Sequence, residues 1–179
     1  MNNVKKFYAL VGCPGAGKST FKENSGLSKY AISADDIRIE LGCIVINEDG
    51  TGYIDQSKNG EVFAIFYNRL EEKLQEGETI VVDNTNLDPR DLKKLRKKAE
   101  MYGYTFEIIL FDISLETLLK RNTDRGYKNV PKERVEEMYE KFLKLNLSNY
   151  YIAKTITEAD QKWSVFLFKK NIRGAIEFL

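Results

Sequence analysis

Histidine is absent from this chain of 179 residues, which also has only two cysteines. Without histidine the chain cannot build a Ser-His-Asp or Cys-His nucleophilic site, nor a zinc site with histidine ligands. Any general base must therefore be a carboxylate, a lysine, a tyrosine or a cysteine. The two cysteines form no metal-binding pattern, and Cys13 lies in a glycine-rich segment where a disulfide would be awkward. We therefore expect a reducing compartment.

The chain also lacks a long hydrophobic run and an excess of either charge. Its 28 basic residues nearly balance its 27 acidic residues, so overall charge does not predict a nucleic-acid-binding protein, and any such site must be local. No run approaches the roughly 18 apolar residues of a membrane span. Residues 1–6 lead directly into a predicted strand, which leaves no room for a signal peptide. We expect a cytoplasmic protein that binds no membrane, with one domain as the default for this length.

What the chain does contain is a glycine-rich motif near its start. Residues 12–19 fit the spacing G-x-x-x-x-G-K-[ST]. The apolar run Phe7–Val11 before the motif predicts a buried strand, and Thr20–Glu23 after it continues as a helix. Glycines let the backbone curl around an anion, and the loop N–H groups then point at phosphates. This context predicts a P-loop that binds a nucleotide.

Each residue of the loop has an expected role in this interpretation. Lys18 should reach the β- and γ-phosphates of ATP or another nucleoside triphosphate, and the Ser19 hydroxyl should coordinate Mg²⁺. The residues of the loop predicted to bind the nucleotide are Gly12, Pro14, Gly15, Ala16, Gly17, Lys18, Ser19 and Thr20. Because histidine is absent, an aspartate is the natural base for a hydroxyl that attacks phosphorus.

Strand-like and helix-like segments alternate along the rest of the chain. Further strands are expected at 29–33, 79–83 and 106–111, and helices at 35–41, 62–74, 89–101, 115–121 and 131–145. Such alternation predicts an α/β fold of the P-loop NTPase type, with a parallel sheet of about four to five strands flanked by helices and a helical lid. Residues 43–60 are rich in Gly, Asn and Asp and are expected to be irregular.

The expected kinase-like domain covers residues 1–145. Residues 146–179 form a C-terminal extension, in which 163–168 could be an edge strand and 172–179 a short final helix. The extension either packs on the core or forms an oligomer contact.

Two polar segments follow predicted strands, where ligands bind in open α/β sheets. Asp35 and Arg38 are three residues apart and share a helix face, so they could be a base for the incoming hydroxyl and a cation for a neighbouring phosphate. The alternative is a helix-capping aspartate with a surface arginine. After the next strand, Asp83, Thr85 and Asn86 are candidates for substrate binding. Asp83 could instead assist Mg²⁺ or orient Arg38.

Two basic segments complete the set. Residues 120–126 resemble a lid in which Arg121 and Arg125, four residues apart, could point at the transferring phosphate. The alternative is a solvated helix end. The helix predicted at 89–101 carries many lysines and arginines around the apolar positions Leu92, Leu95 and Ala99, which is usually just a solvated face. Contact with a nucleic-acid backbone is the alternative there. Asp88 is expected to cap this helix.

Together these motifs resemble the 5′-kinase domain of bacteriophage polynucleotide kinase-phosphatase. The segments that carry the resemblance, between residue 5 and about residue 145, are 12–20, Asp35-Asp36-x-Arg38, Asp83-x-Thr85-Asn86, 120–126, Val130-Pro131 and Met138-Tyr139. The family implies ATP-dependent phosphorylation of a 5′-hydroxyl at a single-stranded or nicked end of DNA or RNA. It implies Asp35 as general base, Arg38 on the 3′-phosphate of the terminal nucleotide, Arg125 on the donor phosphates and a supporting role for Asp83. A phage-encoded member would work in the host cytoplasm.

The sequence departs from the family pattern at three places. Residues 43–60 are unlike the pattern, Ala34 stands where a basic residue is expected, and no Asp-x-Asp-x-Thr run supports a phosphatase. A small-molecule kinase acting on a nucleoside, sugar or antibiotic hydroxyl therefore remains an alternative. A non-catalytic nucleotide-binding module is another, although Asp35 and the lid arginines would then be idle. A GTPase-like switch would need an Asn-Lys-x-Asp segment, which the chain lacks.

Overall fold

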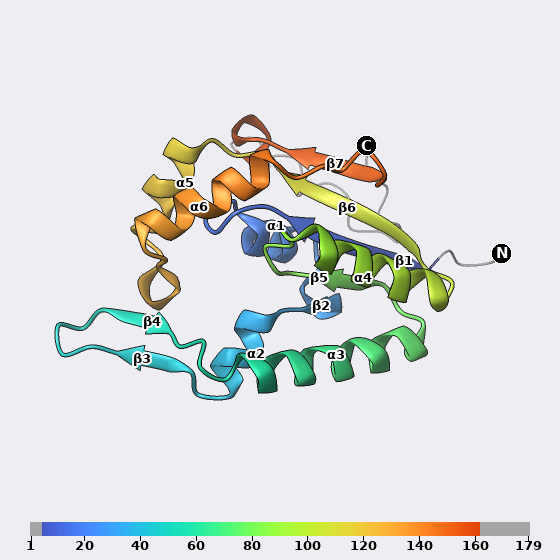
Figure 1. Cartoon of the computed structure of the whole chain (residues 1–179), viewed down its shortest axis with the longest axis horizontal. Coiled ribbons are helices and arrows are strands. Elements are labelled where there is room, and N and C mark those ends of the chain that lie inside the picture. The colour runs from blue at the N-terminus through green and yellow to red at the C-terminus, as the bar shows by residue number, and fades with distance from the viewer. Residues whose placement is uncertain (1–4, 162–179) are drawn as a thin grey trace.

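A five-stranded parallel sheet organises the chain in the computed structural model, which describes residues 5–161 (Figure 1). The strand order is β2-β5-β1-β6-β7. The strands are β1 (Lys6–Val11), β2 (Ala31–Ile32), β5 (Ile80–Val82), β6 (Thr105–Phe111) and β7 (Ile152–Ile156). Strands β1 and β5 are apolar runs without alternation because a parallel sheet is covered on both faces. The predicted fold class is confirmed.

Helices connect the strands and flank the sheet. They are α1 (Lys18–Asn24), α2 (Ala34–Glu40), α3 (Asn59–Glu76), α4 (Pro89–Met101), α5 (Leu115–Asn122) and α6 (Lys132–Leu143). In α3 the residues Val62, Phe66, Leu70 and Leu74 recur every four positions and are buried, so one face of the helix packs on the core. Gly77 ends α3 in the left-handed conformation, as its position in the sequence predicts. Asp88 caps α4 by accepting a hydrogen bond from the Arg90 backbone N–H, which confirms its predicted role.

Two local expectations were wrong. Residues 29–33 contain a strand only at Ala31–Ile32, because Ser28–Tyr30 form a short 3-10 helix instead. Residues 43–60 are not wholly irregular, since β3 (Ile44–Ile46) and β4 (Gly52–Ile54) pair as an antiparallel hairpin. The polar residues in this stretch form the hairpin turn, where the Asn47 N–H donates to the Thr51 carbonyl, while three β-branched residues make β3.

Strand β7 was not expected at its observed position. It lies in the C-terminal extension and pairs in parallel with β6, from Ile108↔Ile152 to Phe111↔Ile156. Its mixed sequence Ile-Ala-Lys-Thr-Ile has only one buried residue, Ile156, so no apolar run marked it. The edge strand expected at 163–168 and the final helix at 172–179 lie outside the described residues. Within residues 5–161, no helix is both long enough and apolar enough to cross a membrane.

The sheet gathers three loops at one edge. The P-loop follows β1, residues 33–36 follow β2, and residues 83–88 follow β5, and these three strands are neighbours in the sheet. Because the strands are parallel, their carboxyl ends meet at the same edge, which is where ligands bind in such folds. The hairpin β3–β4 and the short 3-10 helix η2 (Gly126–Lys128) pack against each other beside this edge.

Candidate active site

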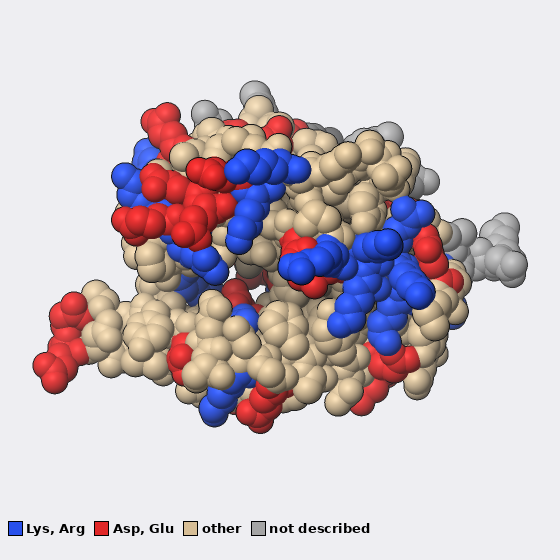
Figure 2. Space-filling model, in the orientation of Figure 1, with Lys and Arg blue, Asp and Glu red and all other residues tan. Residues whose placement is uncertain are grey.

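A cleft of about 930 Å³ opens at this edge of the sheet. Its walls come from the P-loop, from the segments after β2 and β5, from β4, and from α3, α4, η2 and α6. Figure 2 shows the surface hollowed between the upper part of the molecule and the arm formed by the hairpin and α3, with Lys and Arg side chains on both sides of the hollow. The cleft is large enough for a nucleotide and a second substrate.

The P-loop has the geometry of an anion cradle. Gly15 and Gly17 have φ values of 82° and 88°, which only glycine adopts without strain. Gly12 has no such φ, but a Cβ on it would lie 2.8 Å from Phe111 Cβ, so packing against β6 requires glycine there. The Lys18 ammonium donates to the carbonyls of Gly12 and Cys13 at 2.7 and 2.9 Å. It is thereby held across the mouth of the loop.

Burial is the main influence on Lys18 and lowers its pKa, although the Asp83 carboxylate and other nearby anions partly offset this effect. A buried ammonium is stabilised when an anionic ligand arrives, because the ligand replaces the solvation that the charge has lost. This is the electrostatic condition expected of a lysine that binds phosphate.

Asp35 and Arg38 form the second part of the site. Arg38 is only 7% exposed, and its Nη1 donates to Asp35 Oδ1 at 2.7 Å. Its Nε and Nη2 donate to Asn59 Oδ1 at 3.2 and 2.7 Å, and its guanidinium lies 5.9 Å from the centre of the Phe63 ring. The cap of α2 is Ser33, whose side chain accepts from the Asp36 N–H, so Asp35 has no capping bond. Its half-exposed carboxylate faces the cleft.

Asp83 is held by a partner that sequence reasoning missed. The Lys22 ammonium lies 3.0 Å from the Asp83 carboxylate and 3.8 Å from that of Asp36. Burial alone would lower the pKa of Lys22, but the Asp83 charge and hydrogen bond outweigh it and raise the pKa. Lys22 follows Lys18 by four residues on α1, and that spacing is the only sequence signal that it points the same way. Lys22 therefore joins α1 to the end of β5 and to the first turn of α2.

The segment after α5 contributes a cation with one unpaired nitrogen among the described residues. Arg125 lines the cleft, and its buried Nη1 has no hydrogen-bond partner among residues 5–161. Burial lowers its pKa, and the charges of Asp35 and Asp83 act in the opposite direction. A guanidinium stays charged in proteins, so this buried N–H requires an acceptor other than the described residues. A phosphate oxygen is the acceptor that suits it best.

Arg121 behaves differently from Arg125. Its Nη1 donates to Gln161 Oε1 at 2.6 Å and lies 3.5 Å from the Gly15 carbonyl, while Gln161 Nε2 donates to the Ala16 carbonyl at 2.7 Å. Arg121 thus supports the outer side of the P-loop together with the segment after β7. It does not line the cleft.

The segment after β5 joins the site to the sheet. The Thr85 carbonyl accepts from the Gly12 N–H at 3.1 Å, and Asn84 Oδ1 accepts from the Ala34 N–H at 2.9 Å. Asn86 is buried with φ 52°, and its amide donates to the carbonyls of Leu10 and Val82 at 2.8 and 3.3 Å. Asn86 therefore joins β1 to β5, a structural role that the sequence did not indicate.

Replacing Asn86 with alanine should lower the free energy of unfolding by about 1–3 kcal/mol, because buried carbonyls lose their donor, and alanine at a positive φ adds strain. Thermal unfolding measures this effect. Asn86→Gly is the matched control, since it removes the same hydrogen bonds but tolerates the backbone conformation, and it should be milder than Asn86→Ala. Wild-type stability of Asn86→Ala would contradict the structural role.

Two other candidate bases are unsuited to neutral pH. Burial raises the pKa of the Cys13 thiol to about 11, with a smaller opposing effect from Lys18. Burial and the Glu107 charge raise the pKa of Tyr8 to about 12. Among the aspartates of the cleft, Asp83 is almost buried against Lys22, whereas Asp35 and Asp36 are half exposed. Of these two, Asp35 is paired with Arg38, and Asp36 lies 3.8 Å from Lys22.

The cleft collects most of the residues that the sequence singled out. The predicted residues that line it are Pro14, Gly15, Ala16, Gly17, Lys18, Ser19, Asp35, Arg38, Asp83, Thr85, Asn86 and Arg125. Gly12, Thr20 and Arg121 do not line it. Sequence reasoning missed Asn59, Lys22 and Asn84, whose partners Arg38, Asp83 and Ala34 are 21, 61 and 50 residues away along the chain.

The segments that build this cleft are shared with a known protein family. Residues 8–145 match the model of a protein family described as an AAA domain. The chain belongs to this family. The match begins at β1 and ends just after α6, so it contains the P-loop, Asp35, Arg38 and the lid. Together with the parallel sheet and the P-loop, this match places the chain among proteins with the P-loop NTPase type of fold.

Two relatives among curated proteins are similar in sequence. One, from Autographa californica nuclear polyhedrosis virus, is named as a bifunctional polynucleotide kinase/RNA ligase and is 32% identical over 83% of this chain and 22% of its own. The other is an L-seryl-tRNA(Sec) kinase of Methanococcus maripaludis, 33% identical over 74% of this chain and 51% of its own. The chain thus spans about a fifth and about half of the lengths of these relatives.

Solved structures share the fold. A chain of a Pnkp1/Rnl/Hen1 complex superposes with a TM-score of 0.53 and 22% identity, covering 68% of this chain and 41% of its own. A gluconokinase from Sinorhizobium meliloti superposes with a TM-score of 0.50 and 20% identity, covering 87% and 83%. These structural similarities establish the fold but do not identify the molecule that would accept the phosphate. That acceptor must be inferred from the site.

Proposed function

We propose that the protein transfers the γ-phosphate of ATP to a 5′-hydroxyl end of DNA or RNA. The observation that carries this proposal is the pair formed by Asp35 and Arg38 at 2.7 Å in the cleft beside the P-loop. A carboxylate next to a fixed cation can take a proton from a hydroxyl while the cation holds a phosphate on the same acceptor. A 5′-terminal nucleotide offers both groups, since its 3′-phosphate is close to its 5′-hydroxyl.

The roles of the other residues follow. The 5′-oxygen would attack the γ-phosphorus, Asp35 would accept the proton, and ADP would leave. Lys18 and Arg125 would hold the phosphate oxygens and stabilise the charge that spreads over them in the transition state. Arg38 has five N–H donors, of which three are already bonded inside the protein, so two remain for the acceptor phosphate.

Magnesium fits the site as a cofactor. The cation keeps most of its ligands as water and phosphate oxygens, so it needs few protein oxygens. The exposed Ser19 at the rim of the cleft provides one such hard oxygen beside Lys18. When bound beside Ser19, Mg²⁺ would supply positive charge that offsets the negative charge of the donor phosphates.

Aromatic side chains support a nucleotide as acceptor. Tyr53, Phe63 and Tyr127 are large side chains that are 47%, 39% and 36% exposed, and all three line the cleft. Nucleobases bind readily to such surfaces, because stacking on an aromatic ring contributes about 1–3 kcal/mol per base whatever the sequence. A simple sugar would leave these rings exposed to water.

One observation favours a second candidate, a small-molecule kinase. Arg38 is nearly buried and is held by both Asp35 and Asn59, as a purely structural arginine would be. If its two remaining N–H groups bind nothing, the acceptor needs no second phosphate.

Replacing Arg38 with alanine should separate the two candidates. Loss of hydrogen bonds to a phosphate, worth about 1.5–3 kcal/mol, should lower kcat/KM about 10- to 100-fold when the acceptor is a 3′-mononucleotide, while the affinity for ATP stays nearly unchanged. The wild-type protein should likewise prefer a 3′-mononucleotide over the matching nucleoside by a similar factor. Transfer from γ-labelled ATP to these acceptors, to a 5′-hydroxyl oligonucleotide and to simple sugars provides the measurement.

Arg69→Ala is the matched control for Arg38→Ala. Arg69 also pairs with a carboxylate, that of Glu40, but it lies outside the cleft, so its loss should not alter acceptor preference. Equal kcat/KM values of the wild-type protein for the 3′-mononucleotide and the nucleoside would overturn the polynucleotide proposal. The small-molecule kinase would then be the better interpretation of the site.

A further inference from the structure

Helix α6 presents three chemically different faces. Val135 is buried, and Tyr139 and Phe142 pack beside it on the core. The four glutamates of the helix, at 133, 136, 137 and 140, lie on a second face, and none of them lines the cleft. On the third face Arg134, Met138 and Lys141 follow one another at spacings of four and three residues and line the cleft. We call this third face the α6 basic face.

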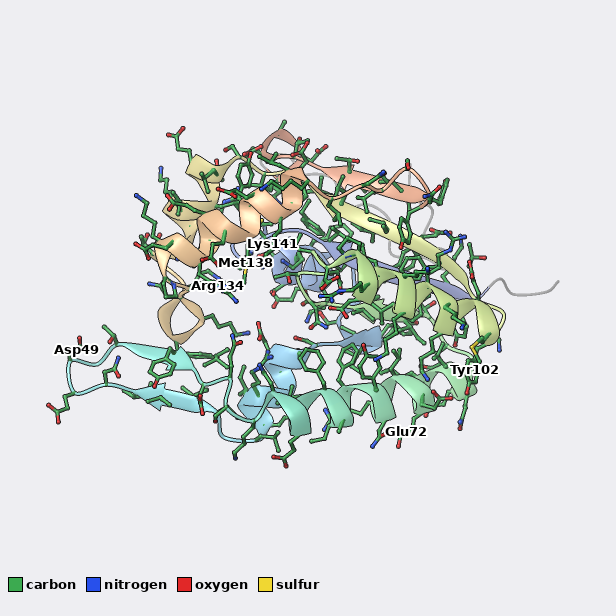
Figure 3. All side chains as sticks on the ribbon, viewed as in Figure 1. Asp49, Glu72, Tyr102, Arg134, Met138 and Lys141 are labelled. Atoms are coloured by element: carbon green, nitrogen blue, oxygen red, sulfur yellow. The ribbon has the colours of Figure 1, made fainter. Side chains whose placement is uncertain are left out.

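The figures show the same division. In Figure 3, Arg134, Met138 and Lys141 lie along the side of α6 that borders the open space above the hairpin. In Figure 2, acidic side chains crowd the outer part of this region, and basic side chains border the hollow. The α6 basic face continues past the end of the helix, because Lys144 and Leu145 also line the cleft.

The wall opposite α6 is the start of α4. Asp88 there has a pKa lowered to about 2, first by hydrogen bonds from Arg90 and further by the charges of Arg90 and Lys141. Lys141 therefore lies close enough to act on Asp88 across the cleft. Arg90 neutralises Asp88 through bonds from Nε and Nη2, which leaves Asp91 as the other acidic group of this wall.

Positive charge prevails in the cleft as a whole. The basic side chains that line it are Lys18, Arg38, Arg90, Arg125, Lys128, Arg134, Lys141 and Lys144, and the acidic ones are Asp35, Asp36, Asp83, Asp88 and Asp91. The residues that line the cleft therefore carry an excess of three positive charges, whereas the whole chain has an excess of one. Two of these cations, Arg134 and Lys144, also pair with Glu137 and Glu140 on the neighbouring face of α6. A protein whose positive and negative charges nearly cancel overall can attract a polyanion only where positive charge is concentrated locally.

We propose that the α6 basic face binds the phosphodiester backbone of the acceptor strand beyond its 5′-terminal nucleotide. This inference rests on the proposed function, and it adds that the protein holds a single strand several nucleotides long. Asp35 and Arg38 take the terminal nucleotide, and the strand leaves the cleft between α6 and the start of α4. Arg134 and Lys141 contact phosphates about three nucleotides apart, while Met138 between them packs against a base or a sugar.

The spacing of these residues suits such a strand. Arg134 and Lys141 are two helical turns apart, which is about 10 Å at a rise of 1.5 Å per residue. A stacked strand advances about 3.4 Å per nucleotide, so the two cations span about three nucleotides. Sequence-tolerant strand binding combines basic groups along the backbone with apolar surfaces for the bases, and this face offers both. Phosphate contacts of this kind also make the affinity depend on salt.

Acceptor length is the variable that tests the proposal. DNA and RNA oligonucleotides of one to eight nucleotides, each with a free 5′-hydroxyl, serve as acceptors at saturating ATP, and KM is measured for each length. For the wild-type protein, KM should fall up to about four nucleotides and then level off. The double variant Arg134→Gln/Lys141→Gln should raise KM for a six-nucleotide acceptor about tenfold, which corresponds to two exposed ion pairs of up to about 1 kcal/mol each. Its ratio of KM values between the mononucleotide and the six-nucleotide acceptor should approach one.

Salt dependence gives a second readout. Each phosphate contact on a single strand contributes about 0.7 to the slope of log affinity against log salt, so the double variant should lose about 1.4 of that slope. Lys132→Gln is the matched control, since Lys132 lies on the same helix, is exposed and pairs with Glu136 outside the cleft. Thermal unfolding of each variant shows that it is folded.

The possible outcomes are distinct. No transfer to a 5′-hydroxyl acceptor of any length would overturn the proposed function and this inference with it. Transfer with a KM independent of length, or a double variant that behaves like Lys132→Gln in both readouts, would overturn the inference alone. A length effect that disappears in the double variant and persists in Lys132→Gln would support it.

Discussion

The Lys18→Ala variant is expected to lose phosphoryl transfer by a factor of about 10² to 10³, the usual effect of removing a group that stabilises developing charge. The variant keeps the backbone amides of the loop but loses the ammonium that now bonds the Gly12 and Cys13 carbonyls at the mouth of the cradle. Turnover with γ-labelled ATP and the best acceptor measures the loss. A binding assay with ATP separates weakened binding from slower chemistry.

A matched lysine controls this experiment. Lys93 is an exposed residue of α4 outside the cleft, so Lys93→Ala should retain wild-type turnover. Because the P-loop interpretation requires Lys18 to bind the phosphates, an active Lys18→Ala protein would contradict it. Turnover near the wild-type level in that variant would show that the phosphates bind elsewhere.

The Asp35→Asn variant should bind ATP as the wild-type protein does and lose about 10² to 10⁴ in kcat, because the amide cannot accept the proton of the incoming hydroxyl. The substitution is nearly isosteric, and the Asp35 side chain is half exposed, so the fold should tolerate it. The amide Oδ1 can still accept the hydrogen bond from Arg38, but the negative charge that pairs with Arg38 is lost. For this reason kcat and KM must be measured separately, since an effect on Arg38 would appear mainly in KM.

Asp36→Asn provides the comparison for Asp35. It removes a neighbouring carboxylate that also lines the cleft and lies 3.8 Å from Lys22, yet it leaves the pair of Asp35 and Arg38 intact. We expect it to be clearly milder. If Asp36→Asn abolishes turnover and Asp35→Asn does not, Asp36 is the base and the geometry around Arg38 has been misread.

Local patterns were sufficient to predict the fold class and the donor half of the site. The P-loop spacing, the apolar run before it and the positive-φ glycines concern residues adjacent in sequence, so their geometry follows from short-range sterics. The alternation of strands and helices then determines a parallel sheet, because crossover connections leave few other arrangements. The sequence was also sufficient to predict that Asp35 and Arg38 lie on the same helix face, because they are three residues apart in α2.

Contacts across the chain could not be predicted in this way. Asn59 holds Arg38 from α3, and Lys22 holds Asp83 from α1, and neither pairing leaves a signal in local spacing. The hairpin was mistaken for an irregular segment because its turn residues outnumber its short strands. Ser33, two residues before Asp35, makes the capping hydrogen bond that was considered for Asp35, since its Oγ accepts from the Asp36 N–H. The residue types alone do not show which of two nearby polar residues caps a helix.

Strand β7 has a practical consequence for the boundaries of the folding unit. The family match ends at Leu145, yet β6 pairs along its outer edge with β7, where the N–H groups of Ile108 and Asp112 donate to the Tyr151 and Ile156 carbonyls. A protein shortened to the matched residues would leave this apolar strand with unsatisfied backbone groups. Such edges recruit strands from other molecules and lead to aggregation. We therefore expect the smallest stable folding unit to include β7 up to Ile156, beyond the residues matched by the family.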